Sequence, residues 1–333
     1  MSNKLFHLNE LTLAGNNVPR LKSVTLQIPC GSTAVVGLSG AGKTSLLNVL
    51  TGFETSFSGE LTSHVPVDAE NRLPLFWVPQ NGGLWPHLTA QQHLEVVDPK
   101  VVRNQKTTAK WRRSAKKADE FLSLFDLNHC RQSLPGELSE GERSRLALAR
   151  ALATHAAVLL LDEPLSHVDP VRKPGYWGIV RQIIAEDGTS MVFTSHEPET
   201  VLRQASHVIC LHDGSVGFDG TVRSLYNDPP SARVGAFLGP LNWFLADEAA
   251  VFLAEHVPGA EVAIRPERLC IESDVRSPIE VVSQPFCGTY AESVVRHQVT
   301  GITKSVQHQL PVVALRVGDR VVFRTVAQSG VSS

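Results

Sequence analysis

The feature that most constrains the fold is a glycine-rich segment at residues 37–44, with the sequence GLSGAGKT. It fits the pattern G-x-x-x-x-G-K-[ST], and it lies between the apolar run Thr33–Val36 and the helical pattern Ser45–Leu50. A strand, a glycine-rich loop and a helix in that order form the context of a phosphate-binding P-loop. The segment therefore predicts an α/β fold of the P-loop NTPase kind.

The loop residues are predicted to hold the phosphates of a nucleotide. Glycines let the backbone curl so that successive N–H groups and the helix N-terminus face the β- and γ-phosphates. Lys43 adds a positive charge, and the Thr44 hydroxyl is a predicted ligand of Mg²⁺. The predicted phosphate-binding residues are Gly37, Ser39, Gly40, Ala41, Gly42, Lys43, Thr44 and Ser45.

Further apolar runs predict the rest of the sheet. Ala157–Leu161 and Thr189–Ser195 are continuous apolar strands with helical segments between them, which is typical of a parallel sheet covered on both faces. His207–Phe218 holds two short apolar runs around the turn dipeptide Asp213-Gly214, which predicts a hairpin.

Two adjacent carboxylates, Asp162 and Glu163, follow the apolar strand that ends at Leu161. A carboxylate at a buried strand end is placed to hold Mg²⁺ through water, and this is the predicted role of Asp162. Glu163 is then free to orient or deprotonate an attacking water, which makes it the predicted catalytic base.

The segment Leu138–Arg143, with the sequence LSEGER, resembles the L-S-G-G-Q-R signature of ATP-binding cassette (ABC) transporter subunits. In that family the signature begins a helix and binds the γ-phosphate of ATP held by the opposite subunit. The resemblance therefore implies that Ser139 and Gly141 bind ATP in trans, at a helix N-terminus that favours anions.

Three other family motifs are present in order. Gln80 resembles the Q-loop glutamine, which contacts Mg²⁺ and the attacking water and links the site to the membrane partner. Asp169, in Ser166–Asp169, resembles the D-loop residue that contributes to the site in trans. His196 resembles the switch histidine that contacts the γ-phosphate, so Gln80, Glu163 and His196 are the implied catalytic residues.

Other segments resemble importers in particular. Residues 84–89, LWPHLT, are similar to the stretch after the Q-loop in importer subunits. Leu225-Tyr226, residues 237–239 and Asn242 resemble the domain boundary of importers for sugars, polyamines, sulfate, molybdate and ferric iron. Residues 263–267, AIRPE, resemble the opening of their C-terminal oligonucleotide-binding-like barrel, the TOBE domain.

These resemblances define the expected organisation. Residues 1–240 are predicted to form the nucleotide-binding domain, with a mostly helical insertion at about residues 84–140. A helix with an apolar face through Trp111, Ala115 and Leu122 is expected inside that insertion. Residues 241–333, with short alternating runs such as Val312–Val317 and Arg320–Val326, are predicted to form a small β-barrel of regulatory type.

The implied function is ATP hydrolysis that drives solute import through a permease. The expected partners are ATP with Mg²⁺, a second copy of the chain, the permease subunits and, through them, a periplasmic or lipid-anchored substrate-binding protein. The apolar stretch Leu146–Leu161 is too short and too interrupted to cross a bilayer, so we expect a peripheral protein on the cytoplasmic face of the inner membrane. A net charge of −2 and a pI near 6.7 give no reason to expect a nucleic-acid partner.

Two alternatives remain open at this stage. One is a soluble ABC ATPase of DNA repair or translation, although the segment between Thr44 and Leu138 is too short for a repair-type coiled coil and the chain has one P-loop. The other is an ATPase that acts mainly as a small-molecule sensor through its C-terminal domain. The sequence does not identify a solute.

Three positions depart from the family pattern. Glu140 and Glu142 replace a glycine and a glutamine in the signature, which adds negative charge near the expected γ-phosphate. Ala14 stands where the family places an aromatic ring that stacks on adenine, although Phe6 or another ring is a candidate to replace it. Tight phosphate binding is expected, whereas adenine binding is expected to be weakened.

Overall fold

The computed structural model describes residues 4–67, 72–97, 117–253, 259–285, 288, 290–311 and 315–326. The chain divides into two compact units, Met1–Val222 and Arg223–Ser333. The first unit contains the P-loop and the acidic strand end, and the second contains the residues that resemble the TOBE domain.

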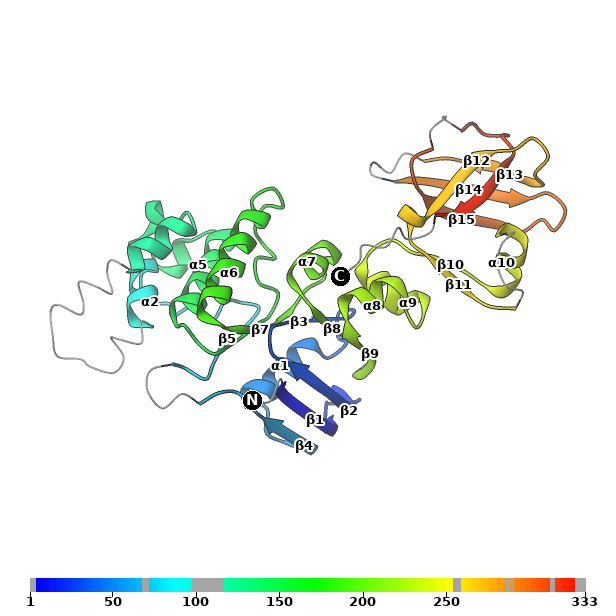
Figure 1. Ribbon diagram of the computed structural model, residues 1–333. Helices are drawn as coiled ribbons and strands as arrows, with labels where there is room; N and C mark the ends of the chain where they lie inside the picture. The colour runs from blue at the N-terminus through cyan, green and yellow to red at the C-terminus, as the bar shows by residue number, and fades with distance from the viewer. Residues whose placement is uncertain are drawn as a thin grey trace, which may run out of the picture. The chain divides into compact units, whose positions relative to one another are not determined.

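The first unit is built on a six-stranded sheet with the order β5-β6-β7-β3-β8-β9 (Figure 1). All neighbours in it pair in parallel except β8 and β9, which form the predicted hairpin with positive φ angles at Asp213 and Gly214. The strands are β3 (Ser32–Val36), β5 (Leu75–Val78), β6 (Val158–Leu161), β7 (Ser190–Thr194), β8 (His207–His212) and β9 (Ser215–Thr221).

A second, antiparallel sheet has the order β2-β1-β4. It contains β1 (Lys4–Leu13), β2 (Leu21–Pro29) and β4 (Phe57–Ser63). One apolar core joins this sheet to the parallel sheet and to helix α1 (Lys43–Thr51), and Leu8, Val35 and Leu46 are among its fully buried members. Burial of apolar surface is the main stabilising term in folding. This core therefore holds the P-loop and α1 against the two sheets.

Helices connect the strands of the parallel sheet. The longer ones are α5 (Glu140–Ala153) and α6 (Lys173–Asp187), followed by the short α7 (Pro198–Gln204). The carboxyl ends of β3, β6 and β7 lead into the P-loop, into Asp162 and into the segment that holds His196. Carboxyl ends of parallel strands meet at one edge of a sheet, so this topology gathers the three motifs in one place.

The regular elements described between the Q-loop and the signature are all helical, as expected for the insertion. It contains α2 (Ala90–Val96), a helix at residues 117–124, and the 3-10 turns η1 (Asn128–Cys130) and η2 (Pro135–Glu137). Trp111 and Ala115, which were expected on the apolar helix face, lie outside the described residues. Within the described part of the chain, no helix has the length and apolar character needed to span a membrane.

The second unit begins with short helices and then becomes β-rich. Its elements are α8 (Val222–Asn227), α9 (Ala232–Gly235), η3 (Ala236–Leu238), β10 (Asn242–Phe244), α10 (Ala246–Phe252), β11 (Val262–Ile264), η4 (Pro266–Arg268), β12 (Leu269–Ser273), β13 (Ile279–Ser283), β14 (Ala291–His297), β15 (Thr303–His308) and β16 (Val321–Thr325). The buried Arg265 guanidinium joins the helices to the strands, because it donates to the carbonyls of Tyr226, Gly235 and Gly239 at 3.0 Å.

Five strands of this unit surround one apolar core. β12 pairs with β16, and β13, β14 and β15 form a three-stranded antiparallel sheet. Backbone bonds from Val281 N to Asp319 O and from Gln309 N to Leu269 O, both 2.9 Å, connect the two groups on either side. The predicted β-rich second domain is confirmed. Of the run expected as a strand at Val312–Val317, residues 312–314 lie outside the described residues and residues 315–317 are not in a strand.

Two glycines of the first unit offer a matched test of backbone geometry. Gly59 in β4 and Gly52 after α1 both have positive φ angles, but only at Gly59 would a Cβ collide with backbone, 2.5 Å from the Glu10 oxygen. We expect Gly52→Ala to lower the free energy of unfolding by about 1 kcal/mol, the cost of a left-handed conformation. We expect Gly59→Ala to cost about 1–3 kcal/mol more because of overpacking, as measured by urea denaturation. Equal costs for both variants would contradict the steric account.

Candidate nucleotide-binding site

A cavity of about 380 Å³ lies at the edge of the sheet where the P-loop, the acidic strand end and the switch segment meet. Its lining brings together most of the residues predicted from the motifs. They are Ser39, Gly40, Gly42, Lys43, Thr44, Ser45, Gln80, Glu163 and His196, together with Arg20, which the sequence did not single out.

The glycines of the loop are required by its geometry. Gly42 has a φ of +104°, and a Cβ there would lie 2.6 Å from the Arg20 carbonyl oxygen. A Cβ on Gly37 would lie 2.4 Å from the Leu211 oxygen. Gly42 is also the N-cap of α1 and makes no side-chain cap bond, so the first N–H groups of the helix remain available to bind an anion.

The Lys43 side chain is folded back onto the loop. Its Nζ donates to the carbonyl oxygens of Gly37 at 2.9 Å and Leu38 at 3.2 Å. Burial lowers the pKa of Lys43, while the nearby carboxylates of Glu163 and Asp162 act in the opposite direction. A phosphate group beside Nζ would also favour the charged form, so the loop is suited to a polyanionic ligand.

Asp162 is held between two threonine hydroxyls. Thr44 Oγ1 donates to its Oδ2 at 2.7 Å, and Thr194 Oγ1 donates to its Oδ1 at 2.6 Å. The fully buried Thr194 hydroxyl also accepts the Glu163 N–H at 2.7 Å. Thr194 therefore orients both carboxylate residues. Sequence reasoning missed it, although its position at the end of the strand before His196 was a usable signal.

Glu163 is the point on which three segments converge. Its Oε2 accepts from Gln80 Nε2 at 3.3 Å, and its Oε1 lies 2.5 Å from His196 Nε2. Its backbone has a φ of +52°, a rare conformation for a residue with a side chain. Strained positions of this kind persist only where the surroundings enforce them, and here the bond to Thr194 does so.

The segment after Gln80 is fixed by Arg150, which sequence reasoning also missed. Arg150 donates to the carbonyls of Gly82 and Gly83 at 2.8 Å, and its guanidinium lies over the Trp85 ring. Burial lowers the pKa of Arg150 to about 10. This value is still above neutral pH, so the side chain stays charged. The position of Gln80 is therefore connected to α5, the helix that begins with the signature.

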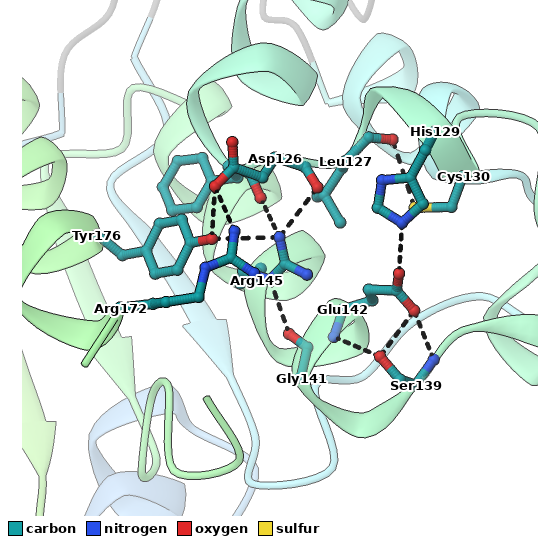
Figure 2. Close-up of polar contacts among 11 residues, drawn as sticks. Asp126, Leu127, His129, Cys130, Ser139, Gly141, Glu142, Arg145, Arg172 and Tyr176 are labelled. Atoms are coloured by element: carbon teal, nitrogen blue, oxygen red, sulfur yellow. Dashed lines mark hydrogen bonds and ion pairs between the residues drawn. The ribbon is translucent and has the colours of Figure 1, made fainter. Parts of the chain in front are cut away.

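The signature begins α5 with a capping box (Figure 2). Glu142 Oε2 accepts from the Ser139 N–H at 2.8 Å and from the Ser139 hydroxyl at 2.7 Å, while Glu142 Oε1 lies 2.6 Å from His129 Nε2. These bonds lower the pKa of Glu142 to about 2, and the two bonds from Ser139 are the largest cause. Glu142 thus serves the cap, and the side chain of Glu140 is exposed near Arg143 and His167.

The residues expected to act in trans lie apart from the cavity. Ser139, Gly141 and Asp169 are all described, and none of the three lines it. The Asp169 side chain accepts from the Val171 N–H at 2.8 Å, and a Cβ on Gly141 would lie 3.1 Å from the His167 oxygen. The P-loop cavity of one chain is therefore formed without these three residues.

The side of the cavity next to Ala14 carries a cation where a ring was expected. Ala14 is exposed, and Phe6 is buried in the core, so Phe6 does not replace the missing ring. Arg20 lines the cavity instead. Its Nε donates to the Ala14 carbonyl at 3.0 Å, and its Nη1 lies 2.7 Å from Glu54 Oε1. A planar guanidinium held in this way offers a face for stacking.

Comparison with known proteins agrees with this geometry. A model of the ABC transporter family matches residues 21–166. The sulfate/thiosulfate import ATP-binding protein CysA of Burkholderia pseudomallei is 32% identical over 318 residues, which cover 93% of this chain and 85% of that protein. The chain belongs to the ABC transporter family.

Other relatives in this family have similar descriptions. The thiamine import ATP-binding protein ThiQ of Ruegeria sp. (strain TM1040) is 34% identical over 216 residues, 62% of this chain and 88% of that protein. The Fe(3+) ions import ATP-binding protein FbpC of Pseudomonas fluorescens is 30% identical, and the match covers 94% of each chain. The resemblance to ATP-binding subunits of ABC importers is thereby confirmed.

Solved structures support the fold of the first unit. A dimeric ATP-binding cassette in a post-hydrolysis state with ADP and Pi matches with a TM-score of 0.56 and 25% identity, over 66% of this chain and 99% of that chain. A dimeric structure of a bacterial ABC transporter cassette matches equally well. The predicted ABC cassette fold is confirmed.

Thr194 provides a test of the carboxylate arrangement. Thr194→Val preserves the shape of the side chain but removes a donor to Asp162 and an acceptor for the Glu163 N–H. An unsatisfied buried polar group costs about 1–3 kcal/mol, so we expect a loss of that size in the free energy of unfolding. We expect ATP turnover to fall about ten- to a hundred-fold, because the carboxylates lose their orientation.

The matched control is Thr194→Ser, which keeps the hydroxyl. It is expected to retain most of the stability in urea denaturation and most of the activity in a phosphate-release assay. If Thr194→Val behaved like Thr194→Ser in both assays, the proposed dependence on the hydroxyl would be wrong.

Proposed function

We propose that this chain is the ATP-hydrolysing subunit of an ABC importer, and that its P-loop cavity is the hydrolytic site. The observation that carries the proposal is the convergence of Gln80 and His196 on Glu163 beside the P-loop lysine. Relatives described as import ATP-binding proteins, matched over most of their length, support the coupling of hydrolysis to import.

In the proposed reaction the P-loop amides and Lys43 bind the β- and γ-phosphates of ATP. Glu163 orients a water molecule and accepts its proton as the oxygen attacks the γ-phosphorus. Gln80 and His196 now contact the two Glu163 oxygens, so they are placed to hold the water and the γ-phosphate when ATP is bound. Removal of a general base typically costs about 10²- to 10⁴-fold in rate.

Thr44 and Gln80, which line the cavity, and Asp162, which contacts Thr44, are a set of oxygen ligands that fits Mg²⁺. The hydroxyl of Thr44, the carboxylate of Asp162 and the amide oxygen of Gln80 are hard ligands of the kind this ion prefers, and Thr44 and Asp162 already contact each other. We propose that these three residues hold it. The ion would neutralise charge on the β- and γ-phosphates.

The proposed active form is a dimer in which each chain completes the site of the other. Ser139, Gly141 and Asp169 do not line the cavity of their own chain, whereas by family resemblance they contact ATP held by the opposite chain. Two structural neighbours described as dimeric, one with ADP and Pi bound, support this arrangement. Capped by Glu142, the α5 N-terminus is already ordered for that contact.

The proposed setting is the cytoplasmic face of the inner membrane, where the dimer would drive permease subunits that receive solute from a substrate-binding protein. The relatives are named for thiamine, sulfate or thiosulfate, Fe(3+) and trehalose import. Their shared chemistry is ATP hydrolysis rather than recognition of one solute. The same names favour an importer over a soluble ATPase of repair or translation.

The catalytic role of Glu163 is tested by Glu163→Gln, which keeps the shape of the side chain and removes the base. We expect ATP binding to persist, turnover to fall about 10²- to 10⁴-fold, and an ATP-dependent dimer to accumulate in light scattering. Lys43→Ala is the contrasting variant, since it should weaken ATP binding itself. A loss of only a few-fold in Glu163→Gln would contradict the assigned base.

We also propose that the Arg20 guanidinium stacks on adenine in place of the missing ring. Stacking on a base is worth about 1–3 kcal/mol, so Arg20→Ala should weaken ATP binding by roughly ten- to a hundred-fold. Arg20→Lys is the matched control, because it keeps the charge and removes the plane. It should lose nearly as much affinity as Arg20→Ala in ATP titrations.

The complementary variant is Ala14→Tyr, which restores a ring to this side of the cavity. We expect it to recover the affinity lost in Arg20→Ala and to raise discrimination between ATP and GTP. Wild-type affinity in both Arg20 variants would show that the guanidinium does not contact the base.

A further inference from the structure

A cluster of three different metal-ligating side chains lies beside the signature (Figure 2). His129 and Cys130 are adjacent on the turn η1, and Glu142 is in the first turn of α5. One ligand atom from each residue lies within 4.8 Å of the other two. The cluster is separate from the P-loop cavity, and none of its three residues lines that cavity.

We propose that His129, Cys130 and Glu142 form a binding site for Zn²⁺. An imidazole nitrogen, a thiolate and a carboxylate oxygen are the three ligand types that Zn²⁺ takes in proteins, usually in tetrahedral geometry. Three protein ligands leave the fourth position to water. The exposure of the His129 side chain, 64%, leaves solvent access for that water and for entry of the ion. The inference does not depend on the proposed function.

The Glu142 carboxylate is held in place for such a site. Its Oε2 is occupied by the Ser139 cap, while its Oε1 faces His129 Nε2 at 2.6 Å. A metal between Oε1 and Nε2 would replace the contact between these two atoms and leave the cap intact. The cap would then act as the outer support that fixes a metal-binding carboxylate, an arrangement that strengthens metal sites.

The thiol of Cys130 is the third ligand of the proposed site and its buried member. Its Sγ lies 3.3 Å from the Leu127 carbonyl oxygen, and the residue is almost fully buried. Burial raises the pKa of the Cys130 thiol and Glu142 raises it further, whereas the nearby Arg145 guanidinium acts in the opposite direction. Arg145 is fixed there by the carbonyl of Phe125 and by that of Asp126, which is labelled in Figure 2.

The charge balance of the proposed site is favourable. Zn²⁺ binding displaces the thiol proton to solvent and forms a Zn–S bond, as is usual for cysteine ligands. The thiolate and the Glu142 carboxylate then neutralise the two charges of the ion, and His129 contributes a neutral nitrogen. No oxidant or reductant is needed.

The geometry requires only small shifts of the ligand atoms. Bonds of about 2.0–2.3 Å to Zn²⁺ place tetrahedral ligand atoms about 3.5 Å apart. The 2.6 Å contact between Glu142 Oε1 and His129 Nε2 therefore has to open by roughly 1 Å, and separations of up to 4.8 Å have to shorten by roughly 1 Å. Bound Zn²⁺ would join η1, in the helical region, directly to the first turn of the signature helix.

The test uses the full-length, nucleotide-free protein titrated with Co²⁺ in buffer without Mg²⁺. Tetrahedral Co²⁺ bound to a thiolate gives visible d–d bands and a near-ultraviolet charge-transfer band from sulfur. We expect one equivalent of Co²⁺ to produce both, and Zn²⁺ to abolish them by displacement. Binding of Co²⁺ in the P-loop cavity gives no sulfur band, because that cavity has no thiol.

Variants assign the ligands. Cys130→Ser should abolish the sulfur band, and Cys30→Ser, at an exposed thiol, is the control that should leave it unchanged. His129→Ala should weaken Zn²⁺ binding at least tenfold in a competition titration, as should Glu142→Gln. The His129 side chain is exposed and the Glu142 side chain is partly buried, so these variants decide the question even if the buried Cys130→Ser variant fails to fold.

Three results would overturn the site. They are the absence of a sulfur band in the wild type, persistence of that band in folded Cys130→Ser, and unchanged Zn²⁺ affinity in His129→Ala. Any of them would leave the cluster as a surface histidine–carboxylate pair that supports the signature cap.

Discussion

The Asp162 carboxylate, shared between the hydroxyls of Thr44 and Thr194, is the interaction on which the arrangement of the site depends. Thr44 comes from the first turn of α1, and Thr194 ends β7. One carboxylate therefore joins the first turn of α1 to the ends of β6 and β7, which lie far apart in sequence. The second bond of Thr194, to the Glu163 N–H, fixes the next residue in a conformation it would not adopt alone.

Features set by local backbone chemistry could be predicted from the sequence. The glycines of the P-loop, the buried strand before Asp162 and the Asp213-Gly214 hairpin each follow from local rules, and the structure has them in place. Contacts between distant side chains could not be predicted. Arg20 enters the cavity only because β2 lies beside the P-loop, and Thr194 reaches Asp162 only through the strand order. No local pattern identifies Arg20, and the signal for Thr194 was its position at the end of the strand before His196.

The signature shows how a departure from a family pattern can be absorbed by structure. Glu142 was expected to add charge near a phosphate, yet its carboxylate is used by the Ser139 N–H, the Ser139 hydroxyl and His129. Helix capping of this kind is worth about 1 kcal/mol and orders the backbone N–H groups that follow. The same bonds occupy the Ser139 hydroxyl, so a phosphate from a second chain would compete with Glu142 for it.

The central claim is that the hydrolytic site is composite, with the P-loop from one chain and the signature from another. It is tested most directly by mixing two inactive variants. Lys43→Ala removes the P-loop cation, and Ser139→Asp keeps a helix cap but sets a negative charge where the γ-phosphate should lie. Phosphate release from the mixture should exceed that of either variant alone, because heterodimers retain one intact site. A mixture no more active than its separate components would contradict the composite site.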